Sequence, residues 1–142
     1  GWKAEGLHRL VRQLNIGARV RFMGFVPDAD LVQLYNQAAL FVYPSKYEGF
    51  GLPLLEAMRC GVPVVTANRS ATAEVAGDAA VLVDPFSPAD LAHGMNRALT
   101  DGVLRAKLIS AGHARAAEHS WEKMARGICA FIFARTAAPS SR

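Results

Sequence analysis

Cysteine is scarce in this sequence. The 142 residues include two cysteines, Cys60 and Cys129, and neither stands in a Cys-x-x-Cys pair or at the spacing of a zinc-binding Cys/His set. This scarcity excludes a disulfide framework and argues against a zinc site. We expect both residues to be buried thiols in a reducing compartment, and we expect no bound metal.

Long apolar runs and basic tracts are missing as well. No apolar run approaches the roughly 18 residues of a membrane-spanning helix, and the N-terminal residues lack the form of a signal peptide. The net charge of +4 comes from scattered basic residues, so nucleic acid is not expected as a partner. With 51% hydrophobic and 20% charged residues, the composition is that of a globular protein of one-domain size.

Helical and strand patterns alternate along the chain. Period and punctuation predict helices at 5–14, 28–38, 52–60 and 72–75, strands at 19–23, 39–43, 62–66 and 80–83, and closing helices at 88–99, 103–118 and from 120 onward. The continuous apolar run at 39–43 predicts a strand buried on both faces. This order indicates parallel βαβ units, and therefore an α/β fold with helices on both faces of a parallel sheet.

The stretch SKYEGFGLPLLEAM, residues 45–58, is the most informative part of the sequence. In a parallel sheet, ligands bind beyond the carboxyl ends of the strands, and this stretch follows such an end. Gly49 and Gly51 permit a tight turn and close approach of a ligand, and a helix opening at Leu52 would present free N–H groups with partial positive charge. The pattern predicts a phosphate site.

Two acids flank this corner. Glu48 precedes the turn, and Glu56 lies about one turn into the expected helix, so they would lie on opposite sides of the phosphate. Carboxylates accept hydrogen bonds from vicinal hydroxyls, so the pair could bind a sugar on one side and a ribose on the other, as in a nucleotide sugar. A simpler interpretation stays open, because a glutamate in a first helical turn often only complements the helix dipole and glycine-rich corners are common.

The spacing of the acids, Glu48 and Glu56 with seven residues between them, resembles the E-x7-E signature of retaining GT-B glycosyltransferases. The run FVYPSKYEGFGLPLLEAMRCGVPVV is similar to family 4 of these enzymes, and so are the flanking segments RVRFMGFVPDADLVQLYNQA, EVAGDAAVLVDPFSPADLA and HSWEKMA. The resemblance implies the C-terminal, donor-binding half of such an enzyme over residues 1–135, with a disordered tail at 136–142. It also implies a Rossmann-like sheet whose first strands are missing, so that the strand at 19–23 would stand apart from the other three.

The resemblance also implies residue roles. Glu48 would be the catalytic residue at the donor sugar, and Glu56 would bind the ribose hydroxyls. The backbone of the turn would hold the sugar hydroxyls and the diphosphate, and the end of an earlier strand would lie near the base. These donor-binding residues are Gly49, Phe50, Gly51 and Leu52 for the turn, and Gly24, Phe25 and Val26 for the base.

The activity implied is transfer of a hexose from a nucleotide-diphosphate sugar, with retention of configuration and without a metal or cofactor, in bacterial polysaccharide biosynthesis. The acceptor would be a polysaccharide, a lipid-linked sugar or a small molecule, bound by an N-terminal domain outside this chain. Two alternatives stay open: a donor-binding module that is inactive alone, and a GT-B sugar-nucleotide epimerase. The expected location is the cytoplasm, with peripheral attachment to the inner face of the membrane also open.

Overall fold

The computed structural model describes residues 4–136 and divides into two compact units, Gly1–Leu31 and Val32–Arg142, which we treat separately. The elements in chain order are α1 (Ala4–Gln13), the 3-10 helix η1 (Gly17–Arg19), α2 (Asp28–Gln37), β1 (Phe41–Tyr43), α3 (Leu52–Arg59), β2 (Val64–Ala67), α4 (Ser70–Ala76), β3 (Ala80–Val83), α5 (Pro88–Thr100), α6 (Gly102–Glu118) and α7 (Trp121–Thr136). The alternation of helix and strand predicted from 28 onward is confirmed.

The prediction of a strand at 19–23 is wrong. Its first residue, Arg19, belongs to η1, and the segment that follows is extended at Val20, with φ −122° and ψ 127°, but pairs with no strand among the described residues. An alternating pattern favours extended backbone, whereas a strand also requires a hydrogen-bonded neighbour. The segment packs instead within its own unit, where the ring centroids of His8 and Phe22 lie 4.0 Å apart.

The second unit is built on a parallel sheet in the order β1-β2-β3. Phe41 pairs with Val64, and Val64 pairs with Ala80, so each strand is in register with the next. Central β2 is buried along its whole length, whereas β1 lies at an edge of the described sheet and its residues are half-buried. The expectation that β1 is buried on both faces is therefore wrong, because within residues 4–136 it pairs with a strand along one edge only.

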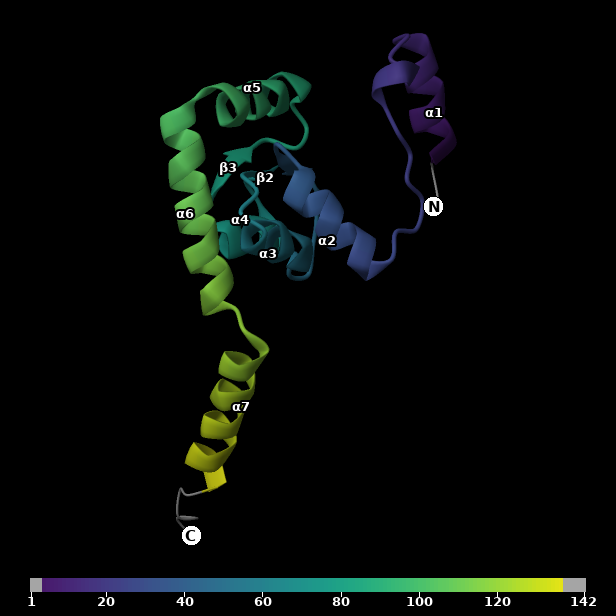
Figure 1. Ribbon diagram of the computed structural model, residues 1–142. Helices are drawn as coiled ribbons and strands as arrows, with labels where there is room; N and C mark the ends of the chain where they lie inside the picture. The colour runs from purple at the N-terminus through teal and green to yellow at the C-terminus, as the bar shows by residue number, and fades with distance from the viewer. Residues whose placement is uncertain (1–3, 137–142) are drawn as a thin grey trace. The chain divides into compact units, whose positions relative to one another are not determined.

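Helix α5 covers one face of this sheet. Val65, Val81 and Val83 point to that face and are buried together with Ala98 of α5 and Leu108 of α6. The approach is close at Gly94 of α5, where an added Cβ would lie 2.6 Å from Cγ1 of Val83. In Figure 1, α5 lies on one side of the strands and α3 and α4 lie on the other.

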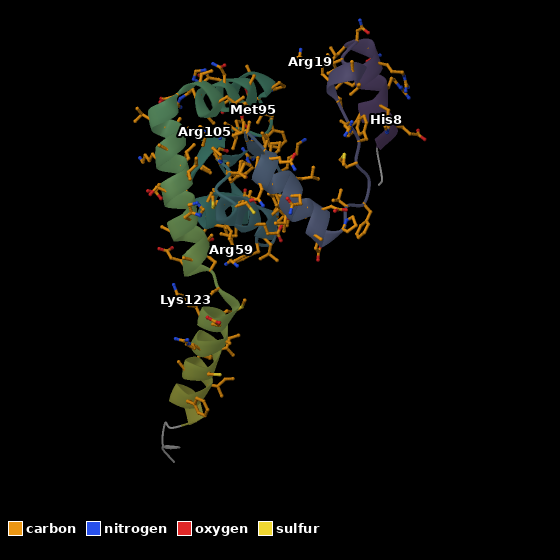
Figure 2. All side chains as sticks on the ribbon, viewed as in Figure 1. His8, Arg19, Arg59, Met95, Arg105 and Lys123 are labelled. Atoms are coloured by element: carbon orange, nitrogen blue, oxygen red, sulfur yellow. The ribbon has the colours of Figure 1, made fainter. Side chains whose placement is uncertain are left out.

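Strand pleating sends Val64 and Thr66 to the face that α3 and α4 cover, and both residues are fully buried. Two arginines, labelled in Figure 2, make hydrogen bonds between α6 and the rest of this unit near the two ends of α6. Arg105 donates to the carbonyl oxygen of Ala39 at 2.6 Å, and Arg59 of α3 donates to that of Ala116 at 3.4 Å. The sheet is thus covered on both faces, as the fold class predicted.

One predicted helix cap is present in the structure, whereas the two cysteines are less buried than expected. The predicted cap at Ser87 is confirmed, since its Oγ accepts a hydrogen bond from the Asp90 N–H at 3.1 Å. The expectation of buried thiols is wrong, because Cys129 lies on an exposed part of α7 and Cys60 is half-buried. No helix within residues 4–136 is long and apolar enough to cross a membrane. The predicted tail lies outside the described residues, except that α7 extends to Thr136.

Candidate functional site

The corner between β1 and α3 turns on Gly51. This residue is buried and has a φ of +94°, and an added Cβ would lie 3.5 Å from both Leu54 Cδ1 and Thr72 Cγ2. Only glycine adopts such a backbone without strain. Gly49, by contrast, is exposed, does not have a positive φ, and would meet nothing within 4 Å if it carried a Cβ. The turn therefore requires glycine at 51, whereas 49 is a position where the backbone is open to solvent.

The start of α3 offers fewer free N–H groups than a typical helix. Pro53 has no N–H, and the N–H of Leu54 bonds to the carbonyl oxygen of Gly51 at 3.0 Å. No side chain caps α3, so the N–H of Leu52 and those of the preceding turn remain for a ligand. The positive end of the helix dipole adds to their attraction for an anion.

The first acid, Glu48, is held at two points. The hydroxyl of Tyr43 donates to its Oε1 at 2.6 Å, and its own backbone N–H donates to Ser70 Oγ at 3.4 Å. The bond from Tyr43, assisted by one from Ser45, lowers the pKa of Glu48 below its usual range. The same bond, together with burial and the nearby negative charge, raises the pKa of Tyr43 to about 12. Glu48 is therefore an ionised, hydrogen-bonded carboxylate at neutral pH.

The second acid, Glu56, also receives a hydrogen bond from a tyrosine. Tyr35 of α2 donates to its Oε2 at 3.2 Å. Tyr35 is 7% exposed, and burial, followed by the charge and hydrogen bond of Glu56, raises its pKa to about 12. Glu56 itself is exposed, so its carboxylate is open to a ligand while one oxygen is held.

A row of rings connects the two tyrosines. The ring of Tyr35 meets Phe41 edge-on at 5.4 Å between centroids, and Phe41 stacks on Tyr43 at 5.9 Å. Phe41 and Tyr43 lie on one face of β1 because side chains alternate along a strand. The two acids are thus joined to one aromatic row on the edge of the sheet.

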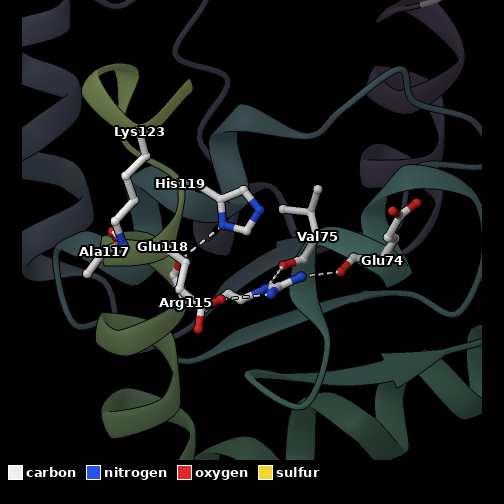
Figure 3. Close-up of polar contacts among 7 residues, drawn as sticks. All are labelled: Glu74, Val75, Arg115, Ala117, Glu118, His119 and Lys123. Atoms are coloured by element: carbon white, nitrogen blue, oxygen red, sulfur yellow. Dashed lines mark hydrogen bonds and ion pairs between the residues drawn. The ribbon is translucent and has the colours of Figure 1, made fainter. Parts of the chain in front are cut away.

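Arg115 of α6 fixes the position of α4, which carries the anchor for Glu48. Its guanidinium donates to the carbonyl oxygens of Val75 at 2.8 Å and Glu74 at 2.7 Å, and it also pairs with Glu118 (Figure 3). These are the last carbonyl groups of α4, which have no partners within the helix. Because α4 begins at Ser70, the same interaction supports the loop that holds Glu48.

Cavities open beside α3. One of about 540 Å³ is lined by Leu52, Glu56 and Arg59 of α3, together with residues of the α6–α7 junction that include His119. A second of about 370 Å³ is lined in part by Phe50, whose ring centroid lies 6.0 Å from that of His119. Both volumes suit a ligand of small-molecule size. Glu56 lines the first cavity, and Glu48 lines neither of the two.

The described structure brings together one group of the predicted residues. Glu48, the turn from Gly49 to Leu52, and Glu56 all lie in the second unit, at the carboxyl end of β1. Gly24, Phe25 and Val26 belong to the first unit, in which Gly24 has a φ of +66° and Phe25 is 91% exposed. Their predicted contact with a base remains a prediction.

No cluster of metal-ligating side chains occurs within residues 4–136. Asp28 and Asp30 have the Asp-x-Asp spacing, but both lie in the first turn of α2, where negative charge complements the helix dipole. His119, at the C-terminal end of α6, has Nδ1 3.0 Å from the carbonyl oxygen of Arg115 (Figure 3). Because a carbonyl only accepts, that nitrogen carries the proton.

Comparison with known proteins now identifies the family. The family model described as glycosyl transferases group 1 matches residues 1–115. The chain belongs to the group 1 glycosyl transferases. Among curated relatives, it is 44% identical over 122 residues to O-antigen chain mannosyltransferase B of Escherichia coli, covering 86% of this chain and 32% of that protein.

Solved structures of glycosyltransferases share the fold. Sucrose-phosphate synthase from Thermosynechococcus elongatus is similar with a TM-score of 0.83 and 31% identity, over 94% of this chain and 34% of that one. HepE from Anabaena, in complex with UDP-glucose, is similar with a TM-score of 0.73 and 31% identity, over 80% of this chain and 32% of HepE. The fold is therefore that of the GT-B glycosyltransferases, and the group 1 chain spans about a third of the length of these relatives.

The sequence patterns assign no role to Tyr35 or Tyr43 in this group 1 domain. Tyr35 belongs to the apolar stripe of α2 and Tyr43 ends an apolar strand, so both are expected to pack. The hydroxyl of Tyr35 meets Glu56 because α2 packs near α3, and the hydroxyl of Tyr43 meets Glu48 because the loop after β1 turns back toward the strand. The alternation that puts Phe41 and Tyr43 on one face is the single sequence signal that points to this arrangement.

Proposed function

We propose that the chain is the donor-binding part of a retaining, metal-independent family 4 glycosyltransferase. It binds a nucleotide-diphosphate hexose, with Glu48 at the sugar, the turn at Gly49 to Leu52 at the sugar and diphosphate, and Glu56 at the ribose. The observation that carries the proposal is a pair of tyrosine-held carboxylates, one before and one after the start of α3, which no side chain caps. The acceptor, a polysaccharide, lipid-linked sugar or small molecule, binds mainly to a domain outside this chain.

Similarity to a mannosyltransferase and to a UDP-glucose complex supports a nucleotide sugar as the ligand. A mannose donor is the first choice, because the mannosyltransferase relative has the higher sequence identity. The chain spans about a third of each of these relatives, so transfer itself requires residues that this chain does not supply.

The chemistry proposed follows from the charges at the corner. In the transfer, the bond between the anomeric carbon and the diphosphate breaks, the acceptor oxygen bonds to that carbon on the same face, and the acceptor proton passes to the diphosphate. Negative charge grows on the leaving group, where the N–H of Leu52 and the helix dipole stabilise it. Positive charge grows on the sugar ring, where the ionised Glu48 stabilises it.

Donor binding by the purified chain tests this proposal. Saturation-transfer NMR against UDP-glucose, GDP-mannose and the two free nucleoside diphosphates should show selective binding of one nucleotide sugar, unchanged by EDTA. Glu56→Ala should weaken the binding of both that sugar and its free diphosphate, since the ribose is common to them. Glu48→Gln should weaken only the binding of the nucleotide sugar.

A charge control separates site effects from general electrostatics. Asp78→Asn removes one exposed carboxylate just before β3, at the opposite end of the strands from the corner, and should leave donor binding unchanged. If a folded chain binds no donor, or if Asp78→Asn weakens binding as much as Glu56→Ala, the site assignment is wrong.

A further inference from the structure

Each of the two acids at the corner is held by a tyrosine whose own position is set by the folded sheet. The backbone carbonyl of Tyr43 accepts a hydrogen bond at 2.8 Å from the hydroxyl of Thr66, a fully buried residue of central β2. The ring of Tyr43 is stacked on Phe41, with 14° between the planes. The phenol that reaches Glu48 is therefore fixed at its backbone and along its ring.

The hydrogen bond from Tyr43 leaves Glu48 able to accept others. A carboxylate has about four acceptor positions, of which the Tyr43 hydroxyl occupies one, and others can accept sugar hydroxyls. At 2.6 Å, the bond has the short length of a charge-assisted O–H···O⁻ contact, which is about twice as strong as a neutral hydrogen bond. Glu48 sits on an otherwise open loop, so without this bond its side chain would sample several rotamers.

Tyr35 has the same relation to Glu56. Its ring is buried against Phe41, and its hydroxyl reaches an acid that is itself exposed. The phenol holds one oxygen of Glu56 and leaves the other for a ligand. The two tyrosines occupy equivalent places at the two ends of the aromatic row.

We propose that Tyr43 is a positioning residue that holds Glu48 for the donor sugar, and that Tyr35 is a positioning residue that holds Glu56 for the ribose. This inference rests on the proposed function for the identity of the two ligand groups. It adds that each carboxylate is preorganised by its own phenol, so the two tyrosines control different parts of one donor. Keeping Glu48 ionised is part of the role of Tyr43, because an ionised acid stabilises positive charge on the sugar ring.

The first test needs no ligand. The pKa of Glu48 is measured from its ¹³C carboxyl shift in the wild-type chain, in Tyr43→Phe and in the control Tyr47→Phe. Phenylalanine keeps the stacking ring of Tyr43 and removes only the hydroxyl, while Tyr47 lies in the same loop, is 83% exposed, and makes no side-chain hydrogen bond to the described residues. The pKa of Glu48 should rise in Tyr43→Phe and stay unchanged in the control. Equal titration in all three chains would overturn the inference.

The second test separates the two tyrosines. Affinities for UDP-glucose and UDP, or for GDP-mannose and GDP if that pair binds more tightly, are measured for the wild type, Tyr43→Phe and Tyr35→Phe. Tyr43→Phe should weaken nucleotide-sugar binding about three- to tenfold and leave diphosphate binding unchanged, whereas Tyr35→Phe should weaken both to a similar degree. Circular dichroism confirms that each variant is folded.

The outcomes distinguish this inference from the proposed function. If the wild type binds the donor but both variants bind nucleotide sugar and diphosphate as it does, the tyrosines do not position the acids and the inference fails alone. The inference also fails alone if Tyr43→Phe weakens nucleotide-sugar and diphosphate binding in the same proportion, because a purely structural role of Tyr43 predicts that result. If the wild type binds neither compound, the proposed function fails and with it the ligand roles of both tyrosines, while the titration still decides whether Tyr43 holds Glu48.

Discussion

Replacing Gly94 with alanine tests how closely α5 packs on the sheet. The new Cβ would lie 2.6 Å from Val83 Cγ1, 3.3 Å from Val81 Cγ1 and 3.6 Å from Val65 Cγ1. The shortest of these is closer than real Cβ contacts occur. Val83 is 2% exposed and β-branched, so the methyl group that would have to move belongs to a buried side chain that is stiff at χ1.

The expected change in the free energy of unfolding for Gly94→Ala is the sum of two opposing effects. Alanine in a helix interior stabilises the folded state by about 1 kcal/mol relative to glycine. Overpacking a dense core destabilises by about 1–3 kcal/mol, and the contact at 2.6 Å belongs at the upper end of that range. The expected net loss is about 1–2 kcal/mol in the free energy of unfolding, which lowers Tm by roughly 3–8 °C for a domain of this size.

Two further glycines in helices calibrate the measurement by urea and thermal unfolding. Gly112→Ala would place a Cβ 3.2 Å from Cγ of Met58, a flexible side chain that can shift, so the loss should be smaller than for Gly94→Ala. Gly127→Ala in α7 meets nothing within 4 Å and should not lower Tm. If Gly94→Ala proves as stable as the wild type, or if Gly127→Ala is equally destabilising, the close approach of α5 to the sheet is wrong.

Further perturbations test single interactions. Arg115→Lys keeps the positive charge but loses the paired hydrogen bonds of the guanidinium to the carbonyl oxygens of Glu74 and Val75 in α4. The free energy of unfolding, measured by urea titration, should fall by about 1–2 kcal/mol, and an unchanged value would contradict the role of this arginine. Ser87→Ala removes the cap on the Asp90 N–H and should cost about 1 kcal/mol in the same assay, with no loss of donor binding. Burial raises the pKa of Tyr35 to about 12 from an ordinary value near 10, so the folded state binds more protons in that window and stability should fall as pH rises from 10 to 12. Because the pKa of Tyr43 is also raised to about 12, Tyr35→Phe should make this fall less steep without abolishing it, and an equally steep fall would refute the assignment.

Local sequence patterns were sufficient for most of the elements. Helices α3 and α5 begin where proline and a serine cap predict, and α3 ends before Gly61, which has a φ of +72°. These signals act within one or two turns, so no distant residue is needed to interpret them. The run from Phe41 to Tyr43 was likewise predicted as a strand from its apolar composition.

Patterns that depend on a neighbour were less informative. The alternation at 19–23 predicted a strand, yet the segment is not in the sheet, because pairing depends on a partner strand as well as on the residues themselves. The half-buried state of β1 has the same cause, since its edge position is a property of the sheet. Burial and pairing are therefore consequences of the assembled fold.

For the candidate site, the sequence by itself determined the glycine corner and the two acids around it, because their spacing along one short stretch places them at a helix start. The bond from Tyr43 to Glu48 spans five positions, but the other contacts that hold the acids were decided only by the tertiary structure. Tyr35 comes from a helix 21 positions before Glu56, and Ser70 lies 22 positions after Glu48. Hydrogen bonds between such distant positions form only when α2, β1, α3 and α4 pack around the same edge of the sheet. The periodicity of a helix or strand shows which residues share a face of that element, but not which residues of other elements they contact.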